Sequence, residues 1–201
     1  MKRRAFGIYF AYTMLPLSLT IASPLQALGD NPGVHGAASQ VQQHGRPQQK
    51  PVAEFVKVVR EATGQFKDVT LAEAAGYHLA FGCVSGPDVG AMGLHYVNMS
   101  LVGDGVLDPA LPEIVIYEQQ PNGRLKLIGA DYLVFYDDWH ATNEAAPELM
   151  GQLMHLFESP NRFGLPAFYT LHVWAWKDNP LGTFVNWHSR VSCDSFDGQA
   201  H

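Results

Sequence analysis

Four segments rich in aromatic and β-branched residues constrain the fold of this chain more than any other feature. Such residues fit the pleated, half-buried surface of a β-sheet, and loops containing proline and glycine separate the segments. The segments are residues 93–99, 113–119, 124–135 and 168–176. We therefore expect a mainly antiparallel sheet, with residues 148–157 forming a short helix or a packed loop before the last strand.

A tight turn is predicted between the second and third of these segments. Asn122 and Gly123 form the dipeptide that is the strongest local signal for a two-residue β-hairpin. With these two residues as the turn, Gln119 pairs with Lys126 and every later pair follows the same register. Both faces of the hairpin are then largely apolar, so we expect it to lie near the centre of the sheet.

Asp131 stands out within this hairpin because it falls on an apolar face. The predicted register gives it a set of aliphatic neighbours, namely Ile114, Ile116, Leu125, Leu127 and Leu133. Burying an isolated carboxylate is costly, so Asp131 needs a hydrogen-bond partner, an opposite charge or a metal ion. It is therefore a candidate residue of a functional site.

Two helices are predicted before the sheet. Residues 51–65 carry apolar side chains at helical spacing, and Pro51 suits a first helical turn. Thr70 and Glu73 match a capping box for a second, shorter helix, and Gly76 stands where a helix-ending glycine is expected. The predicted fold class is α+β, with N-terminal helices packed on a curved, mainly antiparallel β-sheet or partial barrel.

The N-terminus has the three parts of a secretory signal peptide, which we assign to residues 1–22. Lys2, Arg3 and Arg4 precede an uncharged apolar stretch that ends in small residues. The alternative is an uncleaved membrane anchor, but a stretch of about 18 residues is near the lower limit for spanning a bilayer. Pro16 within it also favours cleavage, so we expect a periplasmic or secreted protein.

Residues 23–50 are expected to form a flexible leader, because they contain almost no large apolar side chains. The remaining residues, 51–201, are expected to form a single globular domain. Removing the signal peptide removes three cations and no acid, which leaves 10 cationic and 19 acidic residues and a net charge of −9. An acidic surface repels phosphate backbones, and no other apolar run is long enough to span a membrane. We therefore expect no nucleic-acid partner, and no membrane attachment after signal removal.

Export changes how the two cysteines, Cys83 and Cys193, are interpreted. In an oxidising compartment a pair of cysteines usually forms a disulfide. Such a bond would close a loop of 110 residues and stabilise the fold by about 4–5 kcal/mol in the loop-closure model. The alternatives are two free buried thiols or two thiolate metal ligands.

Two of the nine histidines, His95 and His172, lie within predicted strands. With Asp131 they form a candidate site of two imidazoles and one carboxylate. These ligands suit a divalent transition metal and leave coordination positions open for water or substrate. No short-range spacing such as His-x-His accompanies them. The alternative is that each histidine makes a structural hydrogen bond or acts as a general acid or base.

Three aromatic residues, Tyr96, Trp174 and Trp176, are candidates for lining a ligand pocket beside this site. By strand alternation, Trp174 and Trp176 share a face with His172. The alternative is that all three pack in the core, a role that alternating aromatic residues in strands serve more often.

An ordered set of short motifs resembles a family of small secreted bacterial proteins. The motifs are Met-Gly-x-His-Tyr-x-Asn from Met92, Pro-Glu-Ile-x-x-Tyr-Glu from Pro112, Leu-His-x-Trp-x-Trp from Leu171, Asn-Pro-x-Gly-x-Phe from Asn179, and Val-Ser-Cys from Val191. The resemblance covers residues 65–193 and implies an exported domain in which His95 and His172 deserve attention together, without implying an activity. Asp131 stands where the family has Glu, which keeps a carboxylate. His188 stands where the family has Asn, which argues against His188 as a necessary ligand.

Three function classes follow from these observations. The leading hypothesis is an exported protein that binds a metal ion or small ligand near His95, Asp131 and His172. The first alternative is a periplasmic metal-dependent or histidine-based enzyme at the same site. The second is a structural or oligomer-forming protein whose aromatic residues bury a partner surface.

Overall fold

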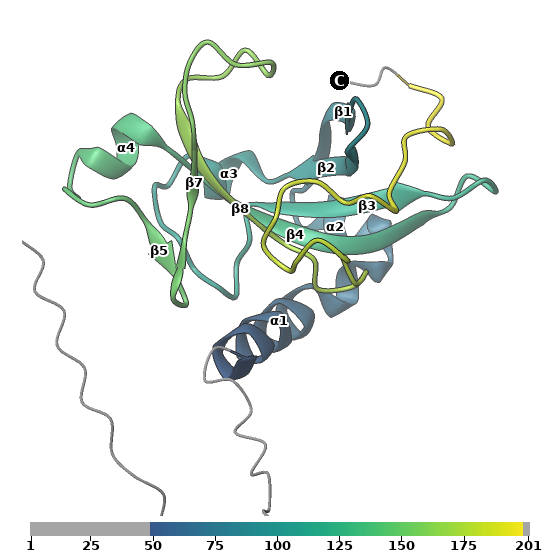
Figure 1. Cartoon of the computed structure of the whole chain (residues 1–201), viewed down its shortest axis with the longest axis horizontal. Helices are drawn as coiled ribbons and strands as arrows, with labels where there is room; N and C mark the ends of the chain where they lie inside the picture. Colours follow the sequence, from purple (N-terminus) through teal and green to yellow (C-terminus); the bar gives the residue numbers. More distant parts are fainter. Residues whose placement is uncertain (1–48, 199–201) are drawn as a thin grey trace, which may run out of the picture. The chain divides into compact units, whose positions relative to one another are not determined.

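Six antiparallel strands form the main sheet in the computed structural model, which describes residues 49–198 (Figure 1). In spatial order they are β1 (His78–Gly86), β2 (Gly90–Val97), β3 (Ile114–Gln119), β4 (Leu125–Phe135), β8 (Phe168–Val173) and β7 (His155–Phe157). The sheet is strongly curled and forms a half-barrel (Figure 1). The predicted α+β class, with helices on a curved antiparallel sheet, is confirmed.

The four predicted strand segments correspond to β2, β3, β4 and β8, but the prediction for residues 148–157 was wrong. This segment contains the hairpin strands β5 (Glu148–Leu149) and β6 (Gln152–Leu153), followed by β7. Met150 and Gly151 have φ angles of 48° and 80°. Two consecutive positive φ angles are typical of a two-residue hairpin turn and incompatible with a right-handed helix.

The turn between β3 and β4 differs from the predicted two-residue turn. The Gly123 N–H donates to the Gln120 carbonyl at 2.8 Å, so Pro121 and Asn122 are the two central residues. Proline favours the first central position of such a turn because its φ is already fixed near −65°. Gly123 follows with a φ of 78°, a conformation that glycine adopts readily.

A β-bulge in β4 corrects the register beyond this turn. Next to the turn, each β3 residue pairs one position earlier on β4 than predicted: the pairs are Gln119–Leu125, Glu118–Lys126 and Tyr117–Leu127. Ile128 is the extra residue, and from Ile116–Gly129 onward the predicted register holds. Leu125 and Leu127 therefore lie on the face opposite Asp131, contrary to the prediction, and Ile128 joins the face of Asp131.

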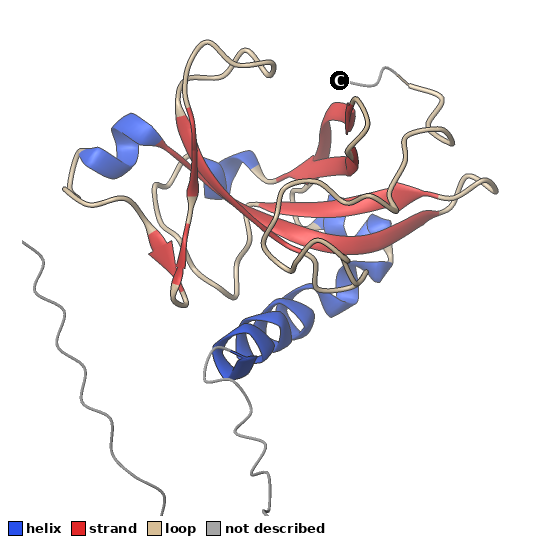
Figure 2. Ribbon diagram, viewed as in Figure 1, coloured by secondary structure: helices blue, strands red, loops and turns tan. Residues whose placement is uncertain are grey.

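Helices cover one face of the sheet. Helix α1 (Gln49–Thr63) buries Phe55 and Val59 completely against a cluster that includes Tyr132. The short helices η1 (Gly64–Lys67) and α2 (Val69–Ala74) continue along the same face, where Phe66 contacts Tyr77 (Figure 2). The helix-covered side of the sheet therefore holds most of the buried aromatic side chains.

Helix α2 begins and ends at defined caps. Its N-cap is Asp68, whose carboxylate accepts the Thr70 N–H at 3.1 Å, so the predicted cap at Thr70 was displaced by two residues. Gly76 ends the helix as predicted, with a φ of 93° and its N–H donating to the Glu73 carbonyl. Two further short helices are α3 (Met99–Val102) and α4 (Tyr136–His140).

The loops after β7 and β8 cover the other face of the sheet (Figure 2). The Cys83–Cys193 disulfide joins β1 to the C-terminal loop with a Cα–Cα distance of 5.7 Å, which confirms the predicted pairing. No helix within residues 49–198 is long and apolar enough to cross a membrane. The predicted signal peptide, and the leader except for its last two residues, lie outside the described residues.

Candidate metal centre

The three predicted ligands come from three different strands on one face of the sheet. Asp131 on β4 and His172 on β8 are register partners, whereas His95 lies on β2, three strand steps away from β8. Three steps amount to about 14 Å in a flat sheet. The curl of the half-barrel closes this distance, and the Nε2 atoms of His95 and His172 lie 3.4 Å apart.

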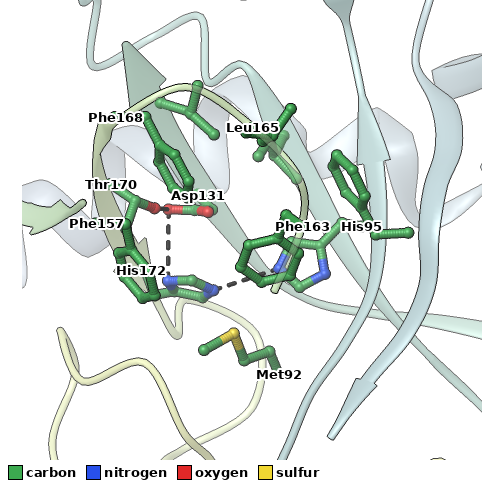
Figure 3. Close-up of a pocket in the computed structure, with 12 residues that line it drawn as sticks. Met92, His95, Asp131, Phe157, Phe163, Leu165, Phe168, Thr170 and His172 are labelled. Carbon is green, nitrogen blue, oxygen red and sulfur yellow. Dashed lines mark hydrogen bonds and ion pairs between the residues drawn. The ribbon is translucent and has the colours of Figure 1, made fainter. Parts of the chain in front are cut away.

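Asp131 lies beside His172, on the side of its Nδ1 atom (Figure 3). Its Oδ1 atom is 3.5 Å from His172 Nδ1. The same oxygen accepts hydrogen bonds from the Thr170 hydroxyl at 2.6 Å and the Leu171 N–H at 3.1 Å. One ligand atom from each of the three residues lies within 4.8 Å of the other two, so the predicted trio does come together.

Hydrogen-bond chemistry leaves both Nε2 atoms available as ligands. His95 Nδ1 is 3.2 Å from the Gly93 carbonyl, which only accepts and therefore keeps the proton on Nδ1. His172 Nδ1 makes no hydrogen bond among the described residues, but the negative charge of the Asp131 carboxylate 3.5 Å away favours a proton on this nitrogen. Two lone pairs then face each other at 3.4 Å, an arrangement that a cation between them would stabilise.

Burial keeps both histidines neutral near neutral pH. Burial, with a smaller contribution from the nearby His172, lowers the pKa of His95 to about 4. Burial also lowers the pKa of His172 to about 3. His155 lowers this pKa as well, whereas Asn186 raises it. Burial raises the pKa of Asp131 to about 6, opposed chiefly by His95 and then by the Thr170 hydroxyl. Neutral imidazole is the form that binds metals.

The three side chains line a small cavity with apolar walls (Figure 3). The apolar lining residues are Phe81, Met92, Ile114, Leu133, Phe157, Phe163, Leu165 and Phe168. The cavity volume is about 30 Å³, which suits an ion and a water molecule and is far below that of a typical organic-ligand pocket. The size of the cavity therefore favours a metal ion over an organic ligand.

Irregularities in two strands aim Phe81 and Met92 into this cavity. Phe81 belongs to a bulge in β1 and has a φ of 64°, which is uncommon for a bulky residue. Met92 is the extra residue of a second bulge, on β2, since Val84 pairs with Gly93 and Ser85 pairs with Ala91. Strand alternation alone would not predict either orientation, and the sequence analysis missed both residues.

The three predicted pocket aromatics lie in different places, and none of them lines the cavity. Tyr96 is on the helix-covered face, with its ring 4.9 Å from that of Tyr117. Trp176 is also on that face, where its indole N–H donates to the Thr63 hydroxyl at 3.0 Å. Trp174 lies on the site's face and stacks on His172 with ring centroids 6.0 Å apart.

The separation of Trp174 from Trp176 follows from the end of β8 at Val173. The Ala175 N–H donates to the Val173 carbonyl at 2.8 Å, a tight turn that breaks the alternation on which the prediction depended. Aromatic lining of the cavity instead comes from four phenylalanines, of which two lie in the unpredicted strands β1 and β7.

Two other buried polar side chains lie near the site. His188 is fully buried, packs edge-on against Trp174 at 4.9 Å and accepts the Arg190 N–H on Nδ1. Glu113 is 1% exposed and accepts the Leu133 N–H at 3.0 Å. Its burial, which the sequence analysis did not predict, raises its pKa to about 8.

Comparisons with known proteins find no match to this chain among family models, curated proteins or solved structures. The function is therefore inferred from the geometry and chemistry of the site itself.

Proposed function

We propose that this protein is an exported metal-binding protein that holds one transition-metal ion between His95 and His172. The observation that carries the proposal is the 3.4 Å separation of the two Nε2 atoms. Two metal–nitrogen bonds of about 2.0–2.1 Å at a tetrahedral angle separate the nitrogens by about 3.3–3.4 Å. The two imidazoles are therefore already spaced as neighbouring ligands of one ion.

Asp131 has the position of a carboxylate that orients a ligating histidine. Metal-bound histidines commonly donate their second N–H to a carboxylate, which fixes the ring and makes the ligand more basic. Asp131 Oδ1 lies 3.5 Å from Nδ1 of His172, whereas the other ring nitrogen, Nε2, is the one that contacts His95. Its hydrogen bonds to Thr170 and Leu171 keep it there without a metal.

Export is supported by three features. The first 22 residues have the pattern of a signal peptide, and the motif set resembles secreted bacterial proteins. The Cys83–Cys193 disulfide is typical of an oxidising compartment. We therefore expect the ion to be bound in the periplasm or outside the cell.

Elemental analysis of untagged protein tests the proposal. The full chain, exported by its own signal and dialysed against metal-free buffer, should contain about one equivalent of a transition metal. His95→Ala and His172→Ala should each lose it, whereas His78→Ala, at an exposed histidine on β1, should retain it. A wild-type content below about a tenth of an equivalent, together with no uptake on addition of metal, would overturn the proposal.

An enzyme at the same site is the second candidate. It is supported by the small number of ligands, because two histidines leave coordination positions open to a substrate. The cavity of about 30 Å³ limits that substrate to a few atoms unless the cover formed by Phe163 and Leu165 moves. Turnover of a small substrate that is lost in both histidine variants would establish this candidate.

A further inference from the structure

We propose that the bound ion is cuprous, Cu(I), and that the thioether of Met92 is its third ligand. This inference rests on the metal site proposed above and adds the identity of the ion and of one more ligand. It starts from the position of Met92, which is 2% exposed and lines the same cavity as His95 and His172. In the view of Figure 3 its sulfur is drawn below the two imidazole rings, which line the same cavity.

The backbone of β2 is shaped so that Met92 and His95 share a face. Residues three apart in a regular strand point to opposite faces. Here Met92 is the extra residue of a bulge, and bulges commonly re-aim a side chain next to a functional site. Gly93 follows with a φ of 97°, and a Cβ added there would lie 2.6 Å from the Tyr117 carbonyl oxygen. This geometry requires glycine after the methionine.

The donor set favours a soft, monovalent ion. Thioether ligands select Cu(I), and imidazole also binds copper. The site offers two neutral imidazoles and one thioether within apolar walls. It therefore has too few oxygen atoms for an ion that needs four to six hard ligands. Asp131 is the one carboxylate among the described residues that line the cavity. One carboxylate balances a monovalent ion, whereas a divalent ion would leave a buried net positive charge, which is costly.

Packing alone is the competing explanation for Met92. Methionine fills irregular gaps and makes favourable contacts with aromatic rings, and four phenylalanines line this cavity. The substitution Met92→Leu separates the two explanations. It keeps the apolar volume at a stability cost usually below about 1.5 kcal/mol, but removes the sulfur.

Competitive titration under anaerobic conditions tests the inference. The full chain is titrated with Cu(I) against the chromophoric chelator bicinchoninate, and in parallel with Zn(II) against a zinc-sensitive dye. Met92→Leu should weaken Cu(I) binding by about 100-fold and Zn(II) binding by less than about threefold. The two effects differ because the substitution removes a ligand that binds copper and not zinc. Met154→Leu, at a buried methionine in the other face's core, should change neither affinity.

X-ray absorption at the copper edge supplies a direct readout. The wild-type complex should show one copper–sulfur distance, which Met92→Leu should abolish. An unchanged Cu(I) affinity in Met92→Leu, or a spectrum without sulfur, overturns this inference and leaves the histidine metal site intact. Binding of Zn(II) without Cu(I) overturns it as well. Failure to bind either ion, together with no other transition metal in the elemental analysis, overturns the proposed function itself.

Discussion

Asp131 and His172 stand opposite each other on the neighbouring strands β4 and β8, with Oδ1 of the first 3.5 Å from Nδ1 of the second. Because the two residues are register partners, the pairing of the strands brings them together. Thr170 and Leu171, also on β8, donate hydrogen bonds to the same carboxylate oxygen. The position of the Asp131 carboxylate beside His172 is thus built into the sheet before any ion binds.

The substitution Asp131→Asn tests this orienting role. Asparagine keeps an oxygen that accepts the Leu171 N–H but loses the charge that favours the proton on His172 Nδ1. We expect metal affinity to fall by about 10–100-fold with little loss of fold, because that is the usual effect of removing such a carboxylate. Competition titration and circular dichroism measure the two effects. Asp138→Asn, at an exposed position on α4, should leave the affinity unchanged, and an equal fall in both variants would contradict the role.

The substitution Gly93→Ala should destabilise the protein by more than about 2 kcal/mol. The new methyl group would lie 2.6 Å from the Tyr117 carbonyl oxygen, and the φ of 97° is one that alanine rarely adopts. Gly123→Ala is the matched control, since Gly123 has a φ of 78° and nothing within 4 Å of an added Cβ. It should cost only about 1–2 kcal/mol. Urea unfolding of both variants measures the difference, and equal losses would show that the contact with Tyr117 is unimportant.

Reduction of the Cys83–Cys193 disulfide should strongly destabilise the protein. The bond closes a loop of 110 residues, for which the loop-closure model gives about 4–5 kcal/mol. Guanidinium unfolding of the wild type and of the Cys83→Ser/Cys193→Ser variant should show this difference in the free energy of unfolding. Addition of a reductant should shift the wild type towards the variant and leave the variant itself unaffected. An unchanged wild-type midpoint after verified reduction would contradict the prediction.

Local patterns were sufficient for four of the six strands of the main sheet, the disulfide and the choice of the three central site residues. Strand composition predicted β2, β3, β4 and β8, and the number of cysteines left one pairing. The Asn-Gly signal found the hairpin, and its register was correct at Asp131 only because the bulge at Ile128 offset the misplaced turn. Alternation within β2 and β8 gave each histidine its neighbours on its own strand, whereas the convergence of His95 and His172 with Asp131 was a hypothesis from their residue types.

The remaining features depend on departures from regular geometry that no periodic pattern contains. Met92 and Phe81 enter the cavity through bulges, and Trp176 leaves the predicted face because β8 ends at Val173. The 3.4 Å contact between His95 and His172 depends on the curl of the whole sheet. Curl is a collective property of six strands, so the sequence of any one strand could not predict it.

Glu113 leads to a prediction about pH that is separate from the metal site. Its carboxyl group is buried at the start of β3 and accepts the Leu133 N–H at 3.0 Å. Burial raises its pKa from 4.5 to about 8, with smaller contributions from Asp131 and Asp104. Between these two pH values the folded protein keeps a proton that the unfolded chain has released. Stability must therefore fall as pH rises, by at most about 1.4 kcal/mol per pH unit from this group.

The substitution Glu113→Gln isolates this contribution, because glutamine keeps the acceptor oxygen and cannot ionise. Near pH 4.5 the variant and the wild type should have similar free energies of unfolding, since Glu113 is then protonated in the folded protein and half protonated in the unfolded chain, a difference of only about 0.4 kcal/mol. At pH 8 the variant should be more stable by at least about 2 kcal/mol, because only the wild type carries the cost of the buried carboxylate. Urea unfolding at several pH values measures the difference between the two proteins, in which the effects of the other titrating groups cancel. A difference that stays constant from pH 4.5 to pH 8 would mean that Glu113 has an ordinary pKa in the folded protein.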